Sequence, residues 1–480
     1  MPFITKGMRT ERKSKSSFLL SFNVLENKIP YMLDLTKLSY PLPDDVENAR
    51  KAGCIELTEI LIERYLNDDS VPRLLKDRLL LEKHNINVLK RAFPYTIEEA
   101  DKLLANEYPG EYIPGSISKL LTDGKLAWII INGKMMVEER VLADAARVLS
   151  LNAGDHGTQK DLNRRDTNIA YMIANKERSA RIKLRTSIKP KTGFGMNARI
   201  NLPVVRPAHS VSDIKFISAS SGFVSVDPET CLMRSARFEK ELTEGDEFFI
   251  EYEYTITAHH RNIGKTSEPI DKKTFSEYLS EQAPHIIFTP YLKALEKEIT
   301  YGITSPSEKA RAIYNWITTH VKYSYMRPYK TICNIPEFAA ANLKGDCGVQ
   351  ALLFITLCRI SGIPAKWQSG LYVTEDDASP HDWAEFYLPE YGWCFADCSF
   401  GGGGFRQGND DRWHYYFGSD DVYRLPANDG CCLGLYGKKH YAADPTDNQR
   451  GEIETDERAL DSDEVECKTE VLSFNYLGAK

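Results

Sequence analysis

A strict two-residue alternation of side chains constrains the fold of this chain more than any other feature. Between residues 250 and 257, apolar side chains alternate with Glu251, Glu253, Thr255 and Thr257. Successive side chains of a strand point to opposite faces, so this pattern predicts a half-buried antiparallel strand. Further strand-like runs, separated by Pro, Gly, Asn and Asp, cover 181–188, 198–205 and 214–226. Together these short strands predict a β-sandwich at residues 166–265.

The residues before this sandwich carry helical patterns. Apolar residues from Asp44 to about Ser150 follow helix-compatible spacing, and Thr96 followed by Glu99 is a capping-box pattern. Asn132-Gly133 separates two apolar runs and suits the positive φ values of a type I′ turn, which predicts a hairpin. We therefore expect a mainly helical N-terminal region with a β-hairpin over residues 1–165.

The composition is that of an ordinary globular protein. Hydrophobic residues make up 42% and charged residues 27% of the 480 residues, and at roughly 150 residues per domain this length predicts about three domains. No apolar run approaches the roughly 18 residues of a membrane span. Basic residues precede the apolar patch Phe18–Val24, but Ser21 and Asn23 interrupt that patch and no small-residue cleavage site follows. We therefore expect a cytoplasmic protein without a membrane span.

The negative charge is concentrated in the last forty residues. Residues 441–480 carry eleven Asp and Glu against four Lys and Arg, a balance of −7 that equals the net charge of the whole chain. The preceding residues are neutral overall and offer no broad basic surface, so we do not expect nucleic acid as a partner. We interpret residues 431–480 as an acidic C-terminal extension that inhibits, tethers or solubilises. The oligomeric state stays open.

Residues 275–430 combine helix and strand patterns. Ser305-Pro306-Ser307-Glu308 joins a capping box to proline at the first helical position, which predicts a helix. A second helix covers residues 347–360 and ends at Gly362. Extended runs follow at 365–373, 381–388 and 392–397. These patterns predict an α+β domain with a helical layer and a sheet layer.

Three short segments of this domain supply a thiol, an imidazole and a carboxylate. They are Gly345-Asp346-Cys347-Gly348, His381-Asp382-Trp383-Ala384-Glu385-Phe386 and Gly392-Trp393-Cys394-Phe395-Ala396-Asp397. Cys347 begins a helix, where free N–H groups and the helix dipole favour the thiolate. His381 can move the proton during acyl transfer, and Asp397 can orient the imidazole ring. We therefore predict that Cys347, His381 and Asp397 form a catalytic triad.

The triad also makes a prediction about strand register. A plain four-residue loop at 389–392 would place Asp397 opposite Ala384, on the face of the sheet away from His381. An odd-length loop or a β-bulge would bring Asp397 and His381 onto a common face. We therefore predict such an irregularity near residues 389–392.

These segments resemble the transglutaminase-like superfamily in order and in flanking sequence. The match includes Ser361-Gly362-Ile363-Pro364-Ala365 after the cysteine helix. Residues 310–323 resemble the preceding helix of bacterial multidomain members, and Tyr416-Phe417-Gly418 with Asp421 and Arg424 resembles the segment that often closes the domain. The resemblance covers residues 285–430 and implies a papain-like fold with Cys347 as nucleophile, His381 as base and Asp397 as third member. It also implies a β-sandwich before the catalytic domain.

The resemblance implies acyl transfer to or from a protein or peptide substrate without a cofactor. The backbone N–H of Cys347 is one candidate oxyanion donor, and Tyr323 or Tyr325 is the upstream aromatic donor that the family commonly adds. Trp383 and Trp393 are expected to wall the site or to pack beneath it. Because nothing identifies an amine-binding site, we favour hydrolysis by a peptidase or amidase over protein-glutamine crosslinking. A catalytically inactive module that binds peptides or proteins is the alternative.

Other functional interpretations of this region fit the sequence less well. Ten cysteines without a regular spacing are expected to be mostly reduced thiols. A zinc site would have to use the poorly spaced residues Cys394, Cys398, Cys431, Cys432 and His414. The run Gly401–Gly404 lacks the Lys-Ser/Thr signature of a phosphate loop and is expected to form a flexible rim. Asp410-Asp411 and Asp420-Asp421 do not make a calcium loop, so we expect no metal.

Overall fold

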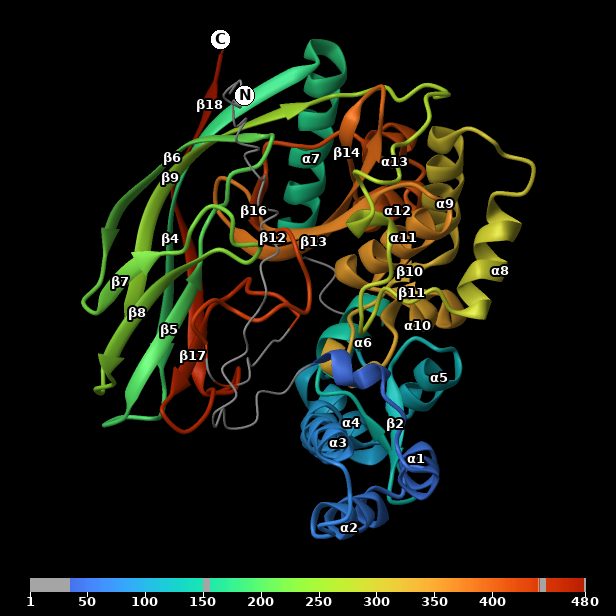
Figure 1. Cartoon of the computed structure of the whole chain (residues 1–480), viewed down its shortest axis with the longest axis vertical. Helices are drawn as coiled ribbons and strands as arrows, with labels where there is room; N and C mark the ends of the chain where they lie inside the picture. Colours follow the sequence, from blue (N-terminus) through green and yellow to red (C-terminus); the bar gives the residue numbers. More distant parts are fainter. Residues whose placement is uncertain (1–34, 150–155, 439, 441–445, 479–480) are drawn as a thin grey trace, which may run out of the picture.

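The computed structural model describes residues 35–149, 156–438, 440 and 446–478 (Figure 1). Two large sheets lie on the left of Figure 1, and the helices of the N-terminal and α+β regions lie on the right. Among the described residues, no helix combines the length and hydrophobicity that crossing a membrane requires. All ten cysteines lie in the described ranges, and none of them forms a disulfide.

Helices and one small sheet form the N-terminal region. In chain order the elements are η1 (Leu35–Ser39), α1 (Asp44–Lys51), α2 (Ile55–Leu66), α3 (Arg73–Ala92), β1 (Tyr95–Thr96), α4 (Ile97–Glu107), α5 (Ser116–Thr122), β2 (Trp128–Ile131), β3 (Lys134–Val137), α6 (Val141–Leu149) and α7 (His156–Asn175). The capping box is confirmed, because Thr96 Oγ1 accepts from the N–H of Glu99 while the Glu99 carboxylate accepts from the N–H of Thr96. The hairpin at Asn132-Gly133 is also confirmed, with φ values of 48° and 79°.

Two four-stranded antiparallel sheets follow, with strand orders β17-β5-β8-β7 and β18-β4-β9-β6. Their strands are β4 (Glu177–Pro190), β5 (Asn197–Pro203), β6 (Val211–Ala219), β7 (Phe223–Val226), β8 (Ser235–Glu241), β9 (Phe248–His259), β17 (Glu452–Thr455) and β18 (Val465–Leu477). The alternation that predicted β9 is confirmed, since Ile250, Tyr252, Tyr254 and Ile256 are all buried. Both sheets contribute to one hydrophobic core cluster. We call this unit the paired sheets.

Two predicted boundaries of this unit are wrong. Helix α7 continues to Asn175, so the sheets begin at Glu177 rather than at residue 166. Residues 431–480 are not a separate acidic extension, because β17 pairs with β5 and β18 pairs with β4. The acidic side chains are accommodated by cations: Lys438 lies 3.1 Å from Glu452, and Arg199 lies 3.7 Å from Glu454.

The α+β region follows the paired sheets and has a five-stranded antiparallel sheet of order β15-β14-β13-β12-β16. Its elements are η2 (Glu277–Leu279), α8 (Pro290–Ile299), α9 (Pro306–His320), β10 (Lys322–Tyr323), η3 (Tyr329–Thr331), α10 (Ile335–Asn342), β11 (Lys344–Gly345), α11 (Cys347–Ile360), β12 (Ala365–Val373), β13 (Ala378–Leu388), β14 (Gly392–Ala396), α12 (Cys398–Arg406), α13 (Asp410–Tyr415), β15 (Phe417–Gly418) and β16 (Arg424–Asn428). Helix α11 is buried along nearly its whole length and packs on β12 and β13.

Two local predictions in this region need correction. Helix α9 begins at Pro306 as expected, but the capping box does not form, because the Ser305 hydroxyl donates to the carbonyl of Thr266 at 2.8 Å. The run Gly401–Gly404 is not a flexible rim but lies inside helix α12. A side chain at Gly401 would place its Cβ 1.7 Å from the hydroxyl oxygen of Tyr314. Glycine there lets α12 pack closely against α9.

Candidate active site

The loop before α11 fixes Cys347 at the N-terminus of that helix. Asp346 is the N-cap residue, and its Oδ1 accepts a 3.1 Å hydrogen bond from the N–H of Val349. The hydroxyl of Tyr329 donates to the same carboxylate oxygen. Burial raises the pKa of Asp346 to about 6, although both hydrogen bonds oppose that shift. The structure therefore places the thiol at the helix start, as predicted, beside the carboxyl group of Asp346.

His381 and Asp397 meet on one face of the five-stranded sheet. Strands β13 and β14 pair Leu388 with Gly392, so the connection between them has three residues. This odd-length connection confirms the predicted irregularity and turns Asp397 to the face of His381. The ring Nε2 of His381 lies 2.7 Å from Oδ2 of Asp397.

Asp397 is held by several donors besides His381. As the N-cap residue of α12, its Oδ1 accepts from the N–H of Phe400 at 2.9 Å and from the Ser399 hydroxyl at 2.8 Å. Arg424 Nη2 donates to Oδ2 at 3.0 Å. Burial disfavours the charged carboxylate, but His381, Arg424 and the N–H of Phe400 outweigh it and hold the pKa of Asp397 well below its usual range. Asp397 is therefore ionised.

Aromatic rings and arginines enclose the His381 ring. Phe400 stacks on it with ring centroids 4.4 Å apart, and Arg165 of helix α7 lies 3.5 Å from the centre of the Phe400 ring. Burial lowers the pKa of His381 below its ordinary value, although Asp397 acts in the opposite direction. His381 is therefore neutral at neutral pH, so with Nε2–H donated to Asp397, Nδ1 is the nitrogen that can accept a proton.

The structure does not join Cys347 to His381. The Cys347 thiol instead donates to Oδ2 of Asp382 at 3.2 Å, and no hydrogen bond links the described side chains of Cys347 and His381. His381 and Asp382 are neighbours in β13, so their side chains point to opposite faces of the sheet. Trp383, on the His381 face, belongs to the core cluster of the paired sheets, and Ala384, on the Asp382 face, belongs to the cluster around α11.

The protonation state of Cys347 in the structure also differs from the predicted thiolate. Burial, followed by the carboxylates of Asp382 and Asp346, raises the pKa of the Cys347 thiol well above its ordinary value. The expected effect of the helix N-terminus is opposed here by desolvation and by two negative charges. In this arrangement Cys347 is a protonated thiol.

The remaining predicted site residues occupy different positions around the thiol. Trp383 is only 1% exposed, and its indole N–H donates to Gln368. Tyr323 is electrostatically coupled to the Cys347 thiol, and its ring meets that of Tyr325 edge to face. Arg140, from the N-terminal region, stacks 3.8 Å from the centre of the Tyr325 ring. The two tyrosines therefore lie on the thiol side of the sheet.

Sequence reasoning missed four residues that shape this site. Arg424 was noticed in the closing segment but was given no role, and Asp382 lies in the recognised His381 segment. Tyr329 and Gln449 carry no local signal, because their contacts with Asp346 and Asp382 join distant parts of the chain. Only the tertiary structure reveals these partners.

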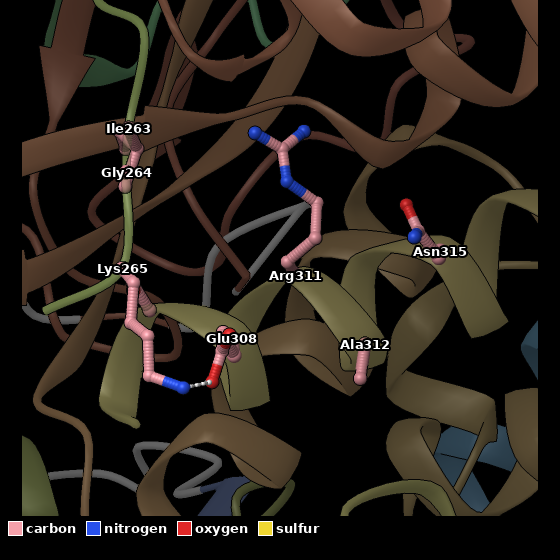
Figure 2. A pocket seen from close by; sticks show the side chains of 8 residues that line it. Ile263, Gly264, Lys265, Glu308, Arg311, Ala312 and Asn315 are labelled. Carbon is pink, nitrogen blue, oxygen red and sulfur yellow. Dashed lines mark ion pairs between the residues drawn. The ribbon is translucent and has the colours of Figure 1, made fainter. Parts of the chain in front are cut away.

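Two surface cavities are lined by other residues. One, of about 330 Å³, lies between residues 263–265 and helix α9, and Figure 2 shows Lys265 paired with Glu308 at its edge. Arg311 lines the same cavity and lies 3.8 Å from the centre of the Phe417 ring. The other cavity lies on β5, β8 and β17. Within the described ranges, no group of three or more His, Cys, Asp and Glu side chains could hold a metal ion.

Residues 293–398 match the family model of the transglutaminase-like superfamily. Cys347, His381 and Asp397 all lie within this match, in the predicted order. The chain contains a transglutaminase-like domain. No curated protein matches the chain in sequence.

Solved structures similar to the chain include a protein described as a cysteine protease and the periplasmic domain of TgpA. A proposed cysteine protease from Cytophaga hutchinsonii is 15% identical, with 63% of this chain and 99% of that chain covered and a TM-score of 0.39. The periplasmic domain of TgpA from Pseudomonas aeruginosa is 14% identical, with 52% and 96% covered and a TM-score of 0.29. The assignment of the transglutaminase-like domain rests on the family match.

Proposed function

We propose that the transglutaminase-like domain catalyses thiol-dependent acyl transfer at amide or peptide carbonyls. The observation that carries the proposal is the buried His381–Asp397 pair, because it leaves Nδ1 of a neutral imidazole ready to accept a proton. Cys347, at the start of a helix in the same matched segment, is the nucleophile. The proposal assigns catalytic roles to Cys347, His381 and Asp397.

The proposed reaction proceeds through a thioester. The Cys347 proton passes to His381 as sulfur bonds to the carbonyl carbon, and the backbone N–H of Cys347 with Tyr323 or Tyr325 supplies donors to the oxyanion. The C–N bond then breaks, and the leaving amine takes the proton from His381. Water attacks the thioester with His381 as base, which releases the carboxylic acid and restores the thiol. For this reaction to proceed, the Cys347 thiol must first break its hydrogen bond with Asp382 and approach Nδ1 of His381.

We favour water over an amine as the acyl acceptor, so the proposed enzyme is a peptidase or amidase. Water needs no binding site of its own, whereas a lysine donor does. We further infer that the paired sheets form a β-sandwich that serves as a scaffold for a protein or peptide substrate. Their shared core cluster, which includes Trp383 and Tyr372 of the catalytic sheet, supports a fixed arrangement of the two units.

A non-catalytic module that binds peptides or proteins is the second candidate. The contact of Cys347 with Asp382, which keeps the thiol protonated, favours this alternative. The two candidates differ in whether Cys347 forms a covalent acyl-enzyme.

Covalent labelling distinguishes the candidates. Wild-type protein, Cys347→Ala and His381→Ala are incubated with a panel of peptide amides and, separately, with a small electrophile at about pH 6, well below the ordinary thiol pKa. An enzyme should show amide hydrolysis that both substitutions abolish, and labelling of Cys347 that Cys347→Ala abolishes. Absence of hydrolysis with every peptide amide of the panel would contradict the proposed function.

A further inference from the structure

The cavity between residues 263–265 and helix α9 is separate from the proposed active site. Its volume of about 330 Å³ falls in the range of roughly 300–1,000 Å³ that is typical of small-molecule sites. Among the described residues, no hydrogen bond or ion pair joins the residues that line it to the side chains of Cys347, His381 or Asp397. The cavity therefore has a chemistry of its own.

The guanidinium of Arg311 is a fixed cation in this cavity. Its Cζ lies 3.8 Å from the centre of the Phe417 ring, a contact that holds the charge but supplies no acceptor oxygen. Glu308, one turn earlier in α9, is paired with Lys265 at 3.0 Å, and Figure 2 shows the Arg311 side chain extending away from it. Because Lys265 and Glu308 neutralise each other at the edge, Arg311 gives the cavity a net positive charge.

Arg311 has neither a hydrogen-bond acceptor nor an ion-pair partner within the described part of the chain. Its side chain is partly buried, and burial lowers its pKa below the ordinary value, although Tyr314 acts in the opposite direction. Arginine keeps its charge in proteins, so a desolvated guanidinium without an anion is a costly arrangement. A bound anion would relieve that cost.

Asn315 adds an unpaired acceptor to the same cavity. It follows Arg311 by four residues in α9, so the two side chains lie on one face of the helix with their Cβ atoms about 5–6 Å apart. The Oδ1 atom of Asn315 is buried and receives no hydrogen bond from the residues that the structure describes. A buried oxygen of this kind costs free energy, and an N–H group of a ligand would satisfy it.

The two unpaired groups call for two neighbouring groups on a ligand. Arg311 calls for an anionic acceptor, and a carboxylate can accept two of its N–H groups at once. Asn315 calls for a donor. In an N-acylated amino acid the carboxylate and the amide N–H are attached to the same carbon, so they are neighbours as Arg311 and Asn315 are on the helix. Ile263 and Ala312 also line the cavity and offer an apolar wall to the side chain of that amino acid.

We propose that this cavity binds an α-carboxylate together with the amide N–H on the same carbon. The carboxylate pairs with Arg311, and the N–H donates to Oδ1 of Asn315. This chemistry occurs at the C-terminus of a peptide and in a free N-acyl amino acid. The inference does not rest on the proposed acyl transfer at Cys347.

Ligand-observed NMR titrations test the inference. The probes are N-acetyl-leucine and its carboxamide, which keeps the N–H and the side chain but lacks the negative charge. Both are titrated into the full chain carrying Cys347→Ala, so that the proposed hydrolysis cannot consume them. The acid should bind at least about tenfold more tightly than the amide, as expected for a hydrogen bond to a charged group. Equal affinities would overturn the inference without any substitution in the cavity.

Three substitutions, each added to that chain, locate the binding. Arg311→Met should weaken binding of the acid at least about tenfold, and Asn315→Ala about threefold or more. Lys309→Met is the matched control, because it removes one positive charge from α9 outside the cavity. It should leave the affinity within about twofold, since a distant exposed charge is screened. If Arg311→Met is folded by circular dichroism and binds the acid like Lys309→Met, the site lies elsewhere and the inference is wrong.

Two further probes distinguish the sources of the carboxylate. Acetyl-Ala-Ala-Leu with a free C-terminus should bind more tightly than N-acetyl-leucine if the ligand is a peptide end, and no more tightly if it is a free N-acyl amino acid. Either result upholds the shared chemistry. Inorganic phosphate carries charge but no N–H, and binding as tight as that of N-acetyl-leucine would overturn the assignment. Because every titration reads binding and not turnover, its failure leaves the proposed acyl transfer untouched.

Discussion

Arg424 donates a 3.0 Å hydrogen bond to Asp397, and both side chains are almost completely excluded from solvent. Arg424 also donates to both carboxylate oxygens of Asp421, at 3.2 Å. Arg424 therefore bridges two buried carboxylates, one of which orients the proposed catalytic histidine. The arrangement ties the electrostatics of the site to the stability of the fold.

Replacing Arg424 should be strongly destabilising. Arg424→Met leaves Asp397 and Asp421 buried without their cation, and breaking a buried pair in this way costs about 3–5 kcal/mol. The free energy of unfolding, measured with urea, should fall by that amount. Arg458→Ala is the control, because Arg458 is 53% exposed in its pair with Glu464 and surface pairs contribute at most about 1 kcal/mol. Equal effects of the two substitutions would contradict the assigned role of Arg424.

A matched pair of glycines tests the close contact between α12 and α9. Gly401→Ala would place Cβ 1.7 Å from the Tyr314 hydroxyl oxygen, whereas a Cβ at Gly403 meets no atom within 4 Å. Gly401→Ala should lower the free energy of unfolding by about 1–3 kcal/mol through overpacking, while Gly403→Ala should raise it by about 0.5–1 kcal/mol. Thermal unfolding midpoints should move in opposite directions. A neutral Gly401→Ala would show that the helices can separate freely.

The buried His285 should make stability pH-dependent. Burial lowers the pKa of His285 to about 3, and the side chain is 1% exposed. Below about pH 6.5 the unfolded chain binds a proton that the folded chain refuses, so this histidine removes about 1.4 kcal/mol of stability per pH unit down to about pH 3. His285→Leu and His285→Gln should both lose this slope in urea unfolding series. If both variants kept the wild-type dependence of unfolding free energy on pH, a group other than His285 would be responsible for it.

Deletion of β18 should impair folding rather than free a tail. Residues 465–480 include the strand that pairs along nearly the whole length of β4, and an uncovered edge of this length favours aggregation. Size-exclusion chromatography should show less monomer and more aggregate after the deletion. A chain cut after Leu477, which keeps β18, serves as control. A deletion that left the monomer yield and the unfolding midpoint unchanged would contradict this role.

Local sequence signals predicted the parts of the site that neighbouring residues determine. The helix start at Cys347 and the pairing of His381 with Asp397 follow from short segments and from the parity of a turn. Asp382 lies in the recognised His381 segment but was assigned no role, because its contact with Cys347 depends on which face of the sheet α11 covers. Gln449 could not be predicted at all, since its contact joins residues 67 positions apart.

The same limit explains the error at the C-terminus. Val465, Cys467 and Val471 lie at alternating positions compatible with a strand, but the local excess of Asp and Glu suggested a solvated extension. That charge is compatible with a sheet because Glu454 pairs with Arg199 and Glu452 pairs with Lys438. Which cation lies beside which carboxylate is visible only in the three-dimensional structure. Charge counting along the chain cannot reveal such pairs.

The late position of β17 and β18 gives the protein an order of assembly during synthesis. Strands β4 and β5 leave the ribosome about 250–290 residues before their edge partners, a delay of roughly 10–60 s at typical elongation rates. Over that interval the nascent chain has two uncovered strand edges, at which chaperones are expected to act. Gln449 emerges just before those strands, so its hydrogen bond with Asp382 can form only after most of the transglutaminase-like domain has left the ribosome.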